Sequence, residues 1–127
     1  KRDCSSGIIT MLSPMVIYST VTLMGKRKTI YHSPSTEIFN KLIYENLRKK
    51  YEIIYNEQPD NKFSIEPLND KDINMNIIKY HDLIIKGWMG KYKIEGQPEL
   101  IKVAYETGLG SKNSQGFGCF AIVPERR

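Results

Sequence analysis

The sequence is poor in cysteine and has no long apolar run. Its two cysteines, Cys4 and Cys119, have no metal-ligand spacing around them and are too few for a disulfide framework, so we expect a reducing, cytoplasmic setting. The apolar runs are far shorter than a membrane span, so we expect no transmembrane helix and no membrane partner. No signal peptide is recognisable after Lys1. Because the chain starts with lysine rather than methionine, we expect it to be a piece of a longer protein.

Two nucleotide-binding signatures are also missing. The glycines within residues 108–118 lack the spacing of a phosphate-binding P-loop. They are predicted to follow a helix and to precede a strand, which is the reverse of a dinucleotide-binding fingerprint. We therefore assign no cofactor and no metal site to the chain.

Length and charge limit the remaining choices. A chain of 127 residues, with 40% hydrophobic and 26% charged residues, is typical of one soluble globular domain. Lysine and arginine exceed the acidic residues, which gives a net charge of +5. A basic surface gains affinity by displacing counterions from phosphates, so the charge favours a polyanionic partner.

The first half of the sequence predicts a strand, a hairpin and a helix. β-Branched and aromatic residues fill residues 8–22 and are interrupted at Ser13-Pro14, a pattern typical of strand, bend and strand. Residues 25–28 predict a basic turn, and residues 29–32 a short returning strand. Ser33-Pro34 fits the start of a helix. Its apolar positions recur every four residues and should face the core: Phe39, Ile43, Leu47 and Tyr51, with Ile38, Leu42 and Ile54 beside them.

The second half predicts further strands and a second helix. Residues 63–68 alternate as a half-buried strand does, and residues 77–95 predict a long bent strand or a hairpin. Trp88 suits a packed core or rim position, and base stacking remains the alternative. A helix should open at Pro98-Glu99 and end at a left-handed cap at Gly108, before a last strand at residues 117–123. The residues expected on its buried side are Leu100, Ile101 and Ala104.

The order strand, helix, strand, strand, helix, strand indicates the fold class. It is the split βαβ pattern of an α+β, ferredoxin-like (RRM-like) domain. We expect an antiparallel sheet with both helices on one face and an inserted β-hairpin. The other face of the sheet would be left for a ligand or a second domain.

The segment 108–118, which we call the glycine loop, is the strongest candidate site. Gly108, Gly110, Gly116 and Gly118 let the backbone approach a ligand closely. Between them stand a cation and neutral hydrogen-bonding groups, which suit phosphates and sugar hydroxyls: Ser111, Lys112, Asn113, Ser114 and Gln115. A tight turn that only packs a helix end onto a strand explains the same residues, and both interpretations stay open from the chemistry alone.

At this loop the sequence resembles a known family. Gly108-Leu109-Gly110, then residues 111–115, then Gly116-Phe117-Gly118, is similar to the glycine-rich signature of the repeat-associated RNA-binding (RAMP) superfamily of CRISPR systems. Within it the chain resembles the C-terminal half of the endoribonuclease that matures guide RNAs. The supporting segments are Leu12-Ser13-Pro14, His32-Ser33-Pro34 and Lys86-Gly87-Trp88-Met89-Gly90. The resemblance covers roughly residues 8–123.

The resemblance implies a CRISPR-associated antiviral nuclease in which two ferredoxin-like halves grip repeat RNA. It implies metal-independent cleavage, in which a ribose 2′-hydroxyl attacks the adjacent phosphate, and a catalytic histidine in the N-terminal half, upstream of Lys1. His32 and His81 do not match that position, so their roles are left open. The implied RNA contacts are Gly108, Gly110, Ser111, Lys112, Asn113, Ser114, Gln115, Gly116 and Gly118, and the cations Lys26, Arg27 and Lys28 are a second candidate set.

Two other functions remain possible from the sequence. The chain could be a non-catalytic structural RNA-binding subunit of a CRISPR effector complex, in contact with other effector subunits. It could also be an unrelated ferredoxin-like domain that binds a metabolite or a protein, which a fully buried glycine loop would favour. The expected partners are CRISPR repeat RNA and an N-terminal ferredoxin-like half, and a lone half would expose a surface that makes a homodimer plausible.

Overall fold

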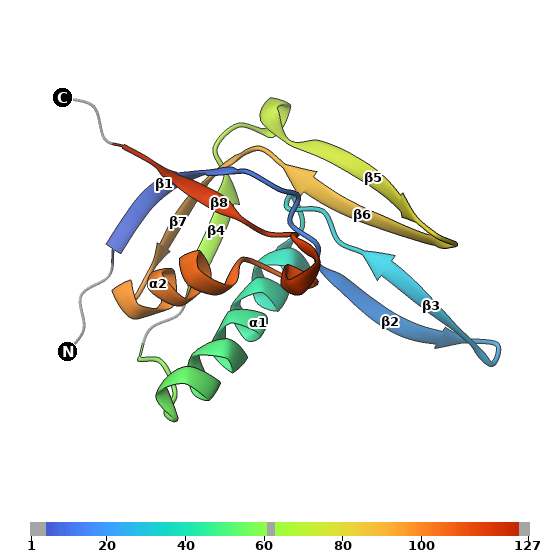
Figure 1. Cartoon of the computed structure of the whole chain (residues 1–127), viewed down its shortest axis with the longest axis horizontal. Coiled ribbons are helices and arrows are strands. Elements are labelled where there is room, and N and C mark those ends of the chain that lie inside the picture. The colour runs from blue at the N-terminus through green and yellow to red at the C-terminus, as the bar shows by residue number, and fades with distance from the viewer. Residues whose placement is uncertain (1–4, 61–62, 125–127) are drawn as a thin grey trace.

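The computed structural model describes residues 5–60 and 63–124, and Cys4 lies outside this range. A four-stranded antiparallel sheet runs in the order β4-β7-β1-β8 (Figure 1). Its strands are β1 (Ser5–Met11), β4 (Ser64–Pro67), β7 (Lys91–Gly96) and β8 (Phe120–Val123). With a helix between β1 and β4 and another between β7 and β8, this is the ferredoxin-like arrangement, and the predicted fold class is confirmed.

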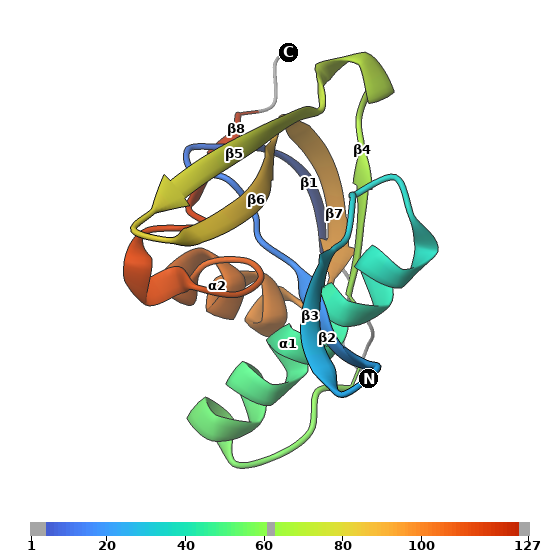
Figure 2. The ribbon, with the colours of Figure 1, turned by 90° about the vertical axis from the view of Figure 1, so that its right-hand side faces the viewer.

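Helices α1 (Glu37–Tyr55) and α2 (Pro98–Thr107) lie on one side of the sheet (Figures 1 and 2). The predicted stripe of α1 is confirmed, because all four of its main members are buried: Phe39, Ile43, Leu47 and Tyr51. Ile38 and Ile54, expected beside them, are exposed. On α2, Leu100 and Ala104 are buried as predicted, together with Val103. Among the described residues, no helix is long and apolar enough to cross a membrane.

The hydrophobic core fills the space between sheet and helices. The sheet contributes alternate residues such as Ile9, Ile65, Tyr92 and Ile94, as the strand period requires. Trp88 is only 7% exposed, so the packed interpretation of this ring is confirmed.

Two β-hairpins extend from the sheet in the same direction (Figure 1). The first consists of β2 (Tyr18–Leu23) and β3 (Lys26–Tyr31). The second consists of β5 (Asn74–Tyr80) and β6 (Leu83–Met89), preceded by the short 3-10 turn η1 (Asp70–Asp72). The second hairpin settles the choice left open for residues 77–95, and only β7 from that stretch joins the main sheet.

Local predictions were wrong at the first hairpin, at the start of α1 and at the end of α2. The basic residues 26–28 belong to β3, and the turn before them is Met24-Gly25, whose positive φ values of 52° and 78° suit a tight hairpin turn. Helix α1 begins at Glu37, because Thr36 donates its backbone N–H back to the Ser33 carbonyl in a separate turn. Gly108 has φ 94° and ψ 162°, a positive-φ conformation that essentially only glycine adopts, rather than the expected left-handed helical cap.

Candidate functional site

The glycine loop has a buried base and an exposed tip. Gly108, Leu109, Gly110 and Gly118 are buried, whereas residues 114–116 at the end of the 3-10 turn η2 (Asn113–Gln115) are exposed. Phe117 follows η2 and precedes β8, so it belongs to the loop rather than to the last strand. The exposed tip gives the loop a surface for a ligand, so the fully buried loop that would favour a metabolite-binding or protein-binding domain is not observed.

Two glycines are required at the base of the loop. A Cβ on Gly110 would lie 2.6 Å from the carbonyl oxygen of Val16, and a Cβ on Gly118 would overlap the carbonyl oxygen of Leu109. Both residues also have positive φ values, 74° and 85°. The close approach allows Ser111 N–H to bond to Val16 at 2.8 Å and Gly118 N–H to bond to Pro14 at 2.9 Å. The loop base is therefore fixed by backbone contacts that only glycine permits.

Lys50 of α1 forms hydrogen bonds with the glycine loop. Its ammonium group donates to the carbonyl oxygens of Gly108 at 2.9 Å and Gly110 at 3.1 Å, and to Oδ1 of Asn113 at 2.7 Å. Burial lowers the pKa of Lys50 from its ordinary 10.5 to about 8. The sequence analysis assigned no role to Lys50, and only the hydrogen bonds of the folded chain connect it to the loop.

Asn113 completes the internal hydrogen bonding of the loop. Its Nδ2 donates to the carbonyl oxygens of Leu109 at 3.1 Å and Phe117 at 2.9 Å, while its Oδ1 accepts from Lys50. Its side-chain amide is thus used within the protein. The predicted contact residues that remain outside the buried base are Ser111, Lys112, Ser114, Gln115 and Gly116.

A cleft between the two hairpins meets the loop at Lys112. We call it the hairpin groove; its volume is about 320 Å³. It combines two cations with aromatic and hydroxyl groups, and its lining comprises Tyr18, Thr20, Arg27, Thr29, Tyr31, Leu83, Ile85 and Lys112. The Lys112 ammonium lies 5.5 Å from the centre of the Tyr18 ring, within cation–π range.

Strand register separates the three hairpin cations. Arg27 stands opposite Thr22, on the face of β3 that lines the groove, whereas Lys28 stands opposite Val21 on the other face. Lys26 shares the face of Lys28. Of the three predicted cations, the structure therefore brings only Arg27 together with Lys112 in the groove.

Tyr31 connects the two walls of the groove. Its hydroxyl donates to the carbonyl oxygen of Ile84 in β6 at 3.0 Å. Desolvation by burial, followed by the nearby Tyr18, raises the pKa of this hydroxyl. The hydrogen bond links the first hairpin to the second.

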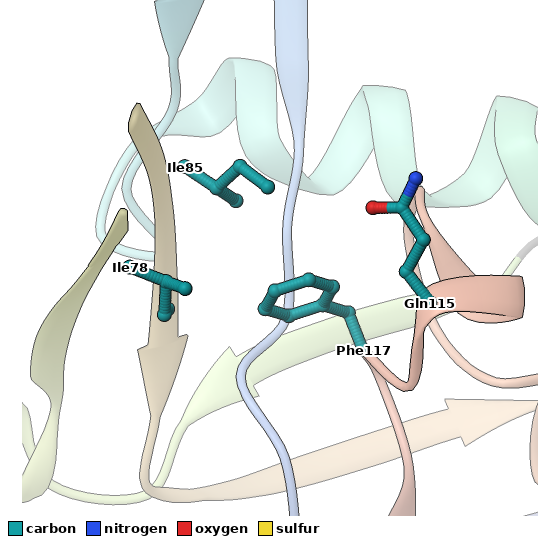
Figure 3. Close-up of a pocket in the computed structure, with 4 residues that line it drawn as sticks. All are labelled: Ile78, Ile85, Gln115 and Phe117. Carbon is teal, nitrogen blue, oxygen red and sulfur yellow. The ribbon is translucent and has the colours of Figure 1, made fainter. Parts of the chain in front are cut away.

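A second cavity lies on the other side of Ile85. We call it the loop cavity; its volume is about 330 Å³, and it is lined by Ile78, Ile85, Gln115 and Phe117 (Figure 3). Figure 2 shows the loop between α2 and β8 beside the second hairpin, which is the arrangement that forms this cavity. The sequence predicted that Phe117 starts the last strand. The only signal for a loop position is that Phe117 stands between Gly116 and Gly118.

Neither histidine lines the groove or the loop cavity. His32 Nε2 lies 2.8 Å from the Ser19 hydroxyl at the base of the first hairpin. His81 occupies the turn of the second hairpin with φ 55°. Within residues 5–60 and 63–124, no three His, Cys, Asp or Glu side chains are grouped so that they could hold a metal ion.

The arrangement suits a flexible polyanion. Cations that alternate with aromatic rings bind the phosphates and the bases of a single strand at the same time. The glycine loop adds backbone and hydroxyl donors at one end of the groove.

Comparison with known proteins tests the predicted family. A family model described as "CRISPR associated protein Cas6, C-terminal" matches residues 2–122. The chain belongs to this family. The predicted membership of the CRISPR endoribonuclease group is confirmed.

Two curated Cas6 proteins are similar to the chain over nearly its whole length. "CRISPR-associated endoribonuclease Cas6 1" of Methanocaldococcus jannaschii is 33% identical over 94% of this chain and 46% of its own length. "CRISPR-associated endoribonuclease Cas6" of Pyrococcus furiosus is 33% identical over 96% of this chain and 44% of its own length. The chain thus spans less than half the length of these Cas6 relatives.

Solved structures agree on the Cas6 fold. A structure titled "CRISPR associated protein Cas6" has a TM-score of 0.83 and 31% identity, over 93% of this chain and 48% of the other. A structure titled "An RAMP protein binding different RNA substrates" has a TM-score of 0.84 over 94% of this chain and 49% of the other, and at 22% identity it supports the fold alone.

Proposed function

We propose that this chain is the RNA-binding C-terminal half of a CRISPR repeat endoribonuclease that cleaves precursor guide RNA within its repeats. The names of the Cas6 relatives, which are endoribonucleases, support the activity. The observation that carries the RNA-binding role is the meeting of Arg27 and Lys112 in a groove with Tyr18 and Tyr31. Phosphates pair with the cations, and unpaired bases stack on the rings.

The proposed chemistry needs no metal ion. The 2′-hydroxyl of the ribose on the 5′ side of the scissile phosphate loses its proton to a general base and attacks phosphorus. The bond to the 5′-oxygen of the next nucleotide breaks, and a general acid protonates that oxygen. The products are a 2′,3′-cyclic phosphate and a 5′-hydroxyl end.

In this proposal the two halves of the enzyme have different roles. The catalytic histidine belongs to the N-terminal half, and the present chain holds the RNA so that the scissile phosphate reaches it. When the groove and the glycine loop bind the RNA strand, they restrict its conformations. This lowers the entropic cost of bringing the attacking 2′-oxygen into line with the bond that breaks.

The full-length gene product and its repeat RNA test the chemistry. We expect cleavage in EDTA, a cyclic phosphate on the upstream product, and no cleavage when the attacking nucleotide carries 2′-deoxyribose. Cleavage of the 2′-deoxy RNA, or a requirement for added Mg²⁺, would contradict the mechanism. Binding of the 2′-deoxy RNA should persist, which separates recognition from chemistry.

One observation favours a second candidate function, a non-catalytic RNA-binding subunit of a CRISPR effector complex. The residues that line the hairpin groove include no histidine and no carboxylate. This candidate predicts tight binding of repeat RNA by the full-length protein without any cleavage, together with stable copurification of effector subunits.

A further inference from the structure

The loop cavity has a different composition from the cationic groove beside it. Three apolar side chains form its walls, two from the second hairpin and one from the glycine loop, and the Gln115 amide lies at its edge (Figure 3). A volume of about 330 Å³ is at the small end of ligand-binding pockets. Such a site suits one flat ring with a polar edge.

Phe117 lies in the glycine loop, and its side chain is not part of the hydrophobic core. It is half-buried and lies outside the set of residues that build the hydrophobic core. Its backbone is held on both sides, because its carbonyl accepts from Asn113 and the adjacent Gly118 donates to Pro14. Figure 3 shows its ring directed toward Ile78 and Ile85 across the cavity. Because its backbone is fixed and its ring faces the cavity, Phe117 offers an aromatic surface on which a base can stack.

Gln115 supplies the polar edge. It is exposed in η2, and no hydrogen bond to another described residue holds its side-chain amide. A carboxamide presents an acceptor and a donor in one plane, which matches the paired donor and acceptor atoms on the edge of a nucleobase.

The neighbourhood favours a nucleic-acid base over an apolar protein side chain. Ile85 lines both the loop cavity and the hairpin groove, so the two sites are adjacent. A strand whose phosphates contact Arg27 and Lys112 therefore passes the cavity. The charge beside the cavity complements an RNA backbone.

We propose that the loop cavity receives one unpaired RNA base, which stacks on Phe117 and presents its polar edge to Gln115. The inference rests on the proposed function, because it requires that the protein binds RNA. It adds a base-reading position to a loop whose other groups suit phosphates and sugar hydroxyls.

An abasic scan tests the site with the full-length protein. Each nucleotide of a fluorescein-labelled repeat RNA is replaced in turn by an abasic ribose, and the dissociation constant is measured by anisotropy. In the wild-type protein, one position should lose affinity about 5- to 150-fold, the range expected for one stacked base.

Phe117→Leu is the matching variant, because leucine keeps an apolar side chain in the cavity and removes the aromatic face. In Phe117→Leu, the abasic substitution at the same position should lower the affinity for RNA less than about threefold, because little stacking remains to be lost. Ile53→Ala is the control, because it truncates an 83% exposed side chain near the end of α1. Its loss of affinity at each abasic position should equal that of the wild-type protein. A 2-aminopurine at the sensitive position should be quenched on binding wild-type protein and much less on binding Phe117→Leu.

The outcomes separate the two proposals. If the wild-type protein binds the repeat RNA but no abasic position is sensitive to Phe117→Leu, the base site is wrong and the proposed function stands. The same conclusion follows if the 2-aminopurine signal is equal in both proteins. If the wild-type protein does not bind repeat RNA, the proposed function fails and the base site fails with it.

Discussion

The ammonium nitrogen of Lys50 in α1 lies 2.7 Å from the side-chain oxygen of Asn113 in the glycine loop. The same nitrogen bonds to two loop carbonyls, at Gly108 and Gly110. The Cas6-like loop is therefore held on a rigid helix rather than left flexible. Preorganisation of this kind lowers the entropic cost of binding.

Replacing Lys50 by methionine should loosen the loop. The change leaves three oxygens without their charged donor, so we expect the free energy of unfolding to fall by about 2 kcal/mol in urea titrations. Affinity for repeat RNA should fall, with the salt dependence of binding unchanged, because Lys50 contacts the loop and not phosphate. Lys49→Met, at the exposed neighbouring position, is the control and should change stability little. A reduced salt slope in Lys50→Met would show direct contact with RNA.

The lowered pKa of Lys50 predicts a pH dependence of stability. Between pH 8 and 10.5 the folded chain has lost the Lys50 proton, while the unfolded chain still holds it. Stability rises with pH wherever the unfolded state binds more protons, so the contribution of Lys50 should increase over this window. Urea titrations at several pH values should show the wild-type free energy of unfolding rising relative to that of Lys50→Met. A flat or falling difference would contradict the lowered pKa.

Arg27 and Lys28 are adjacent cations that should behave differently. Arg27 lines the groove, whereas Lys28 lies on the opposite face of β3. Arg27→Ala should weaken RNA binding about tenfold and reduce the slope of log affinity against log salt by about 0.7, the value for one phosphate contact on a single strand. Lys28→Ala is the matched control, with the same loss of charge. Equal effects of the two variants would place the RNA outside the groove.

Gly116 and Gly118 provide a second matched pair. Both have positive φ values, but a Cβ has open space at Gly116 and overlaps the Leu109 backbone at Gly118. Gly116→Ala should therefore cost about 1 kcal/mol of stability, the strain of the left-handed conformation alone. Gly118→Ala should cost about 3 kcal/mol or more, since overlap adds to that strain. Thermal or urea unfolding measures both, and equal losses would contradict the packing at Gly118.

Local pattern was enough to predict most of the fold. The four-residue repeat of Phe39, Ile43, Leu47 and Tyr51 specified the buried face of α1, because a helix places such positions on one stripe. Alternation indicated the strand at residues 63–68, β-branched and aromatic residues indicated the first strand, and the spacing of the glycines located the loop and indicated the family. These signals operate within one element, so the sequence displays them directly.

The site depended on contacts between distant segments. The sequence determined that this protein has a glycine loop, a basic hairpin and a ferredoxin-like order of elements. Only the tertiary structure decided that Lys50 holds the loop, that Arg27 rather than Lys28 faces Lys112, and that Phe117 lines a cavity with Ile85. Strand register and helix packing set these pairings, and both are properties of the folded chain as a whole.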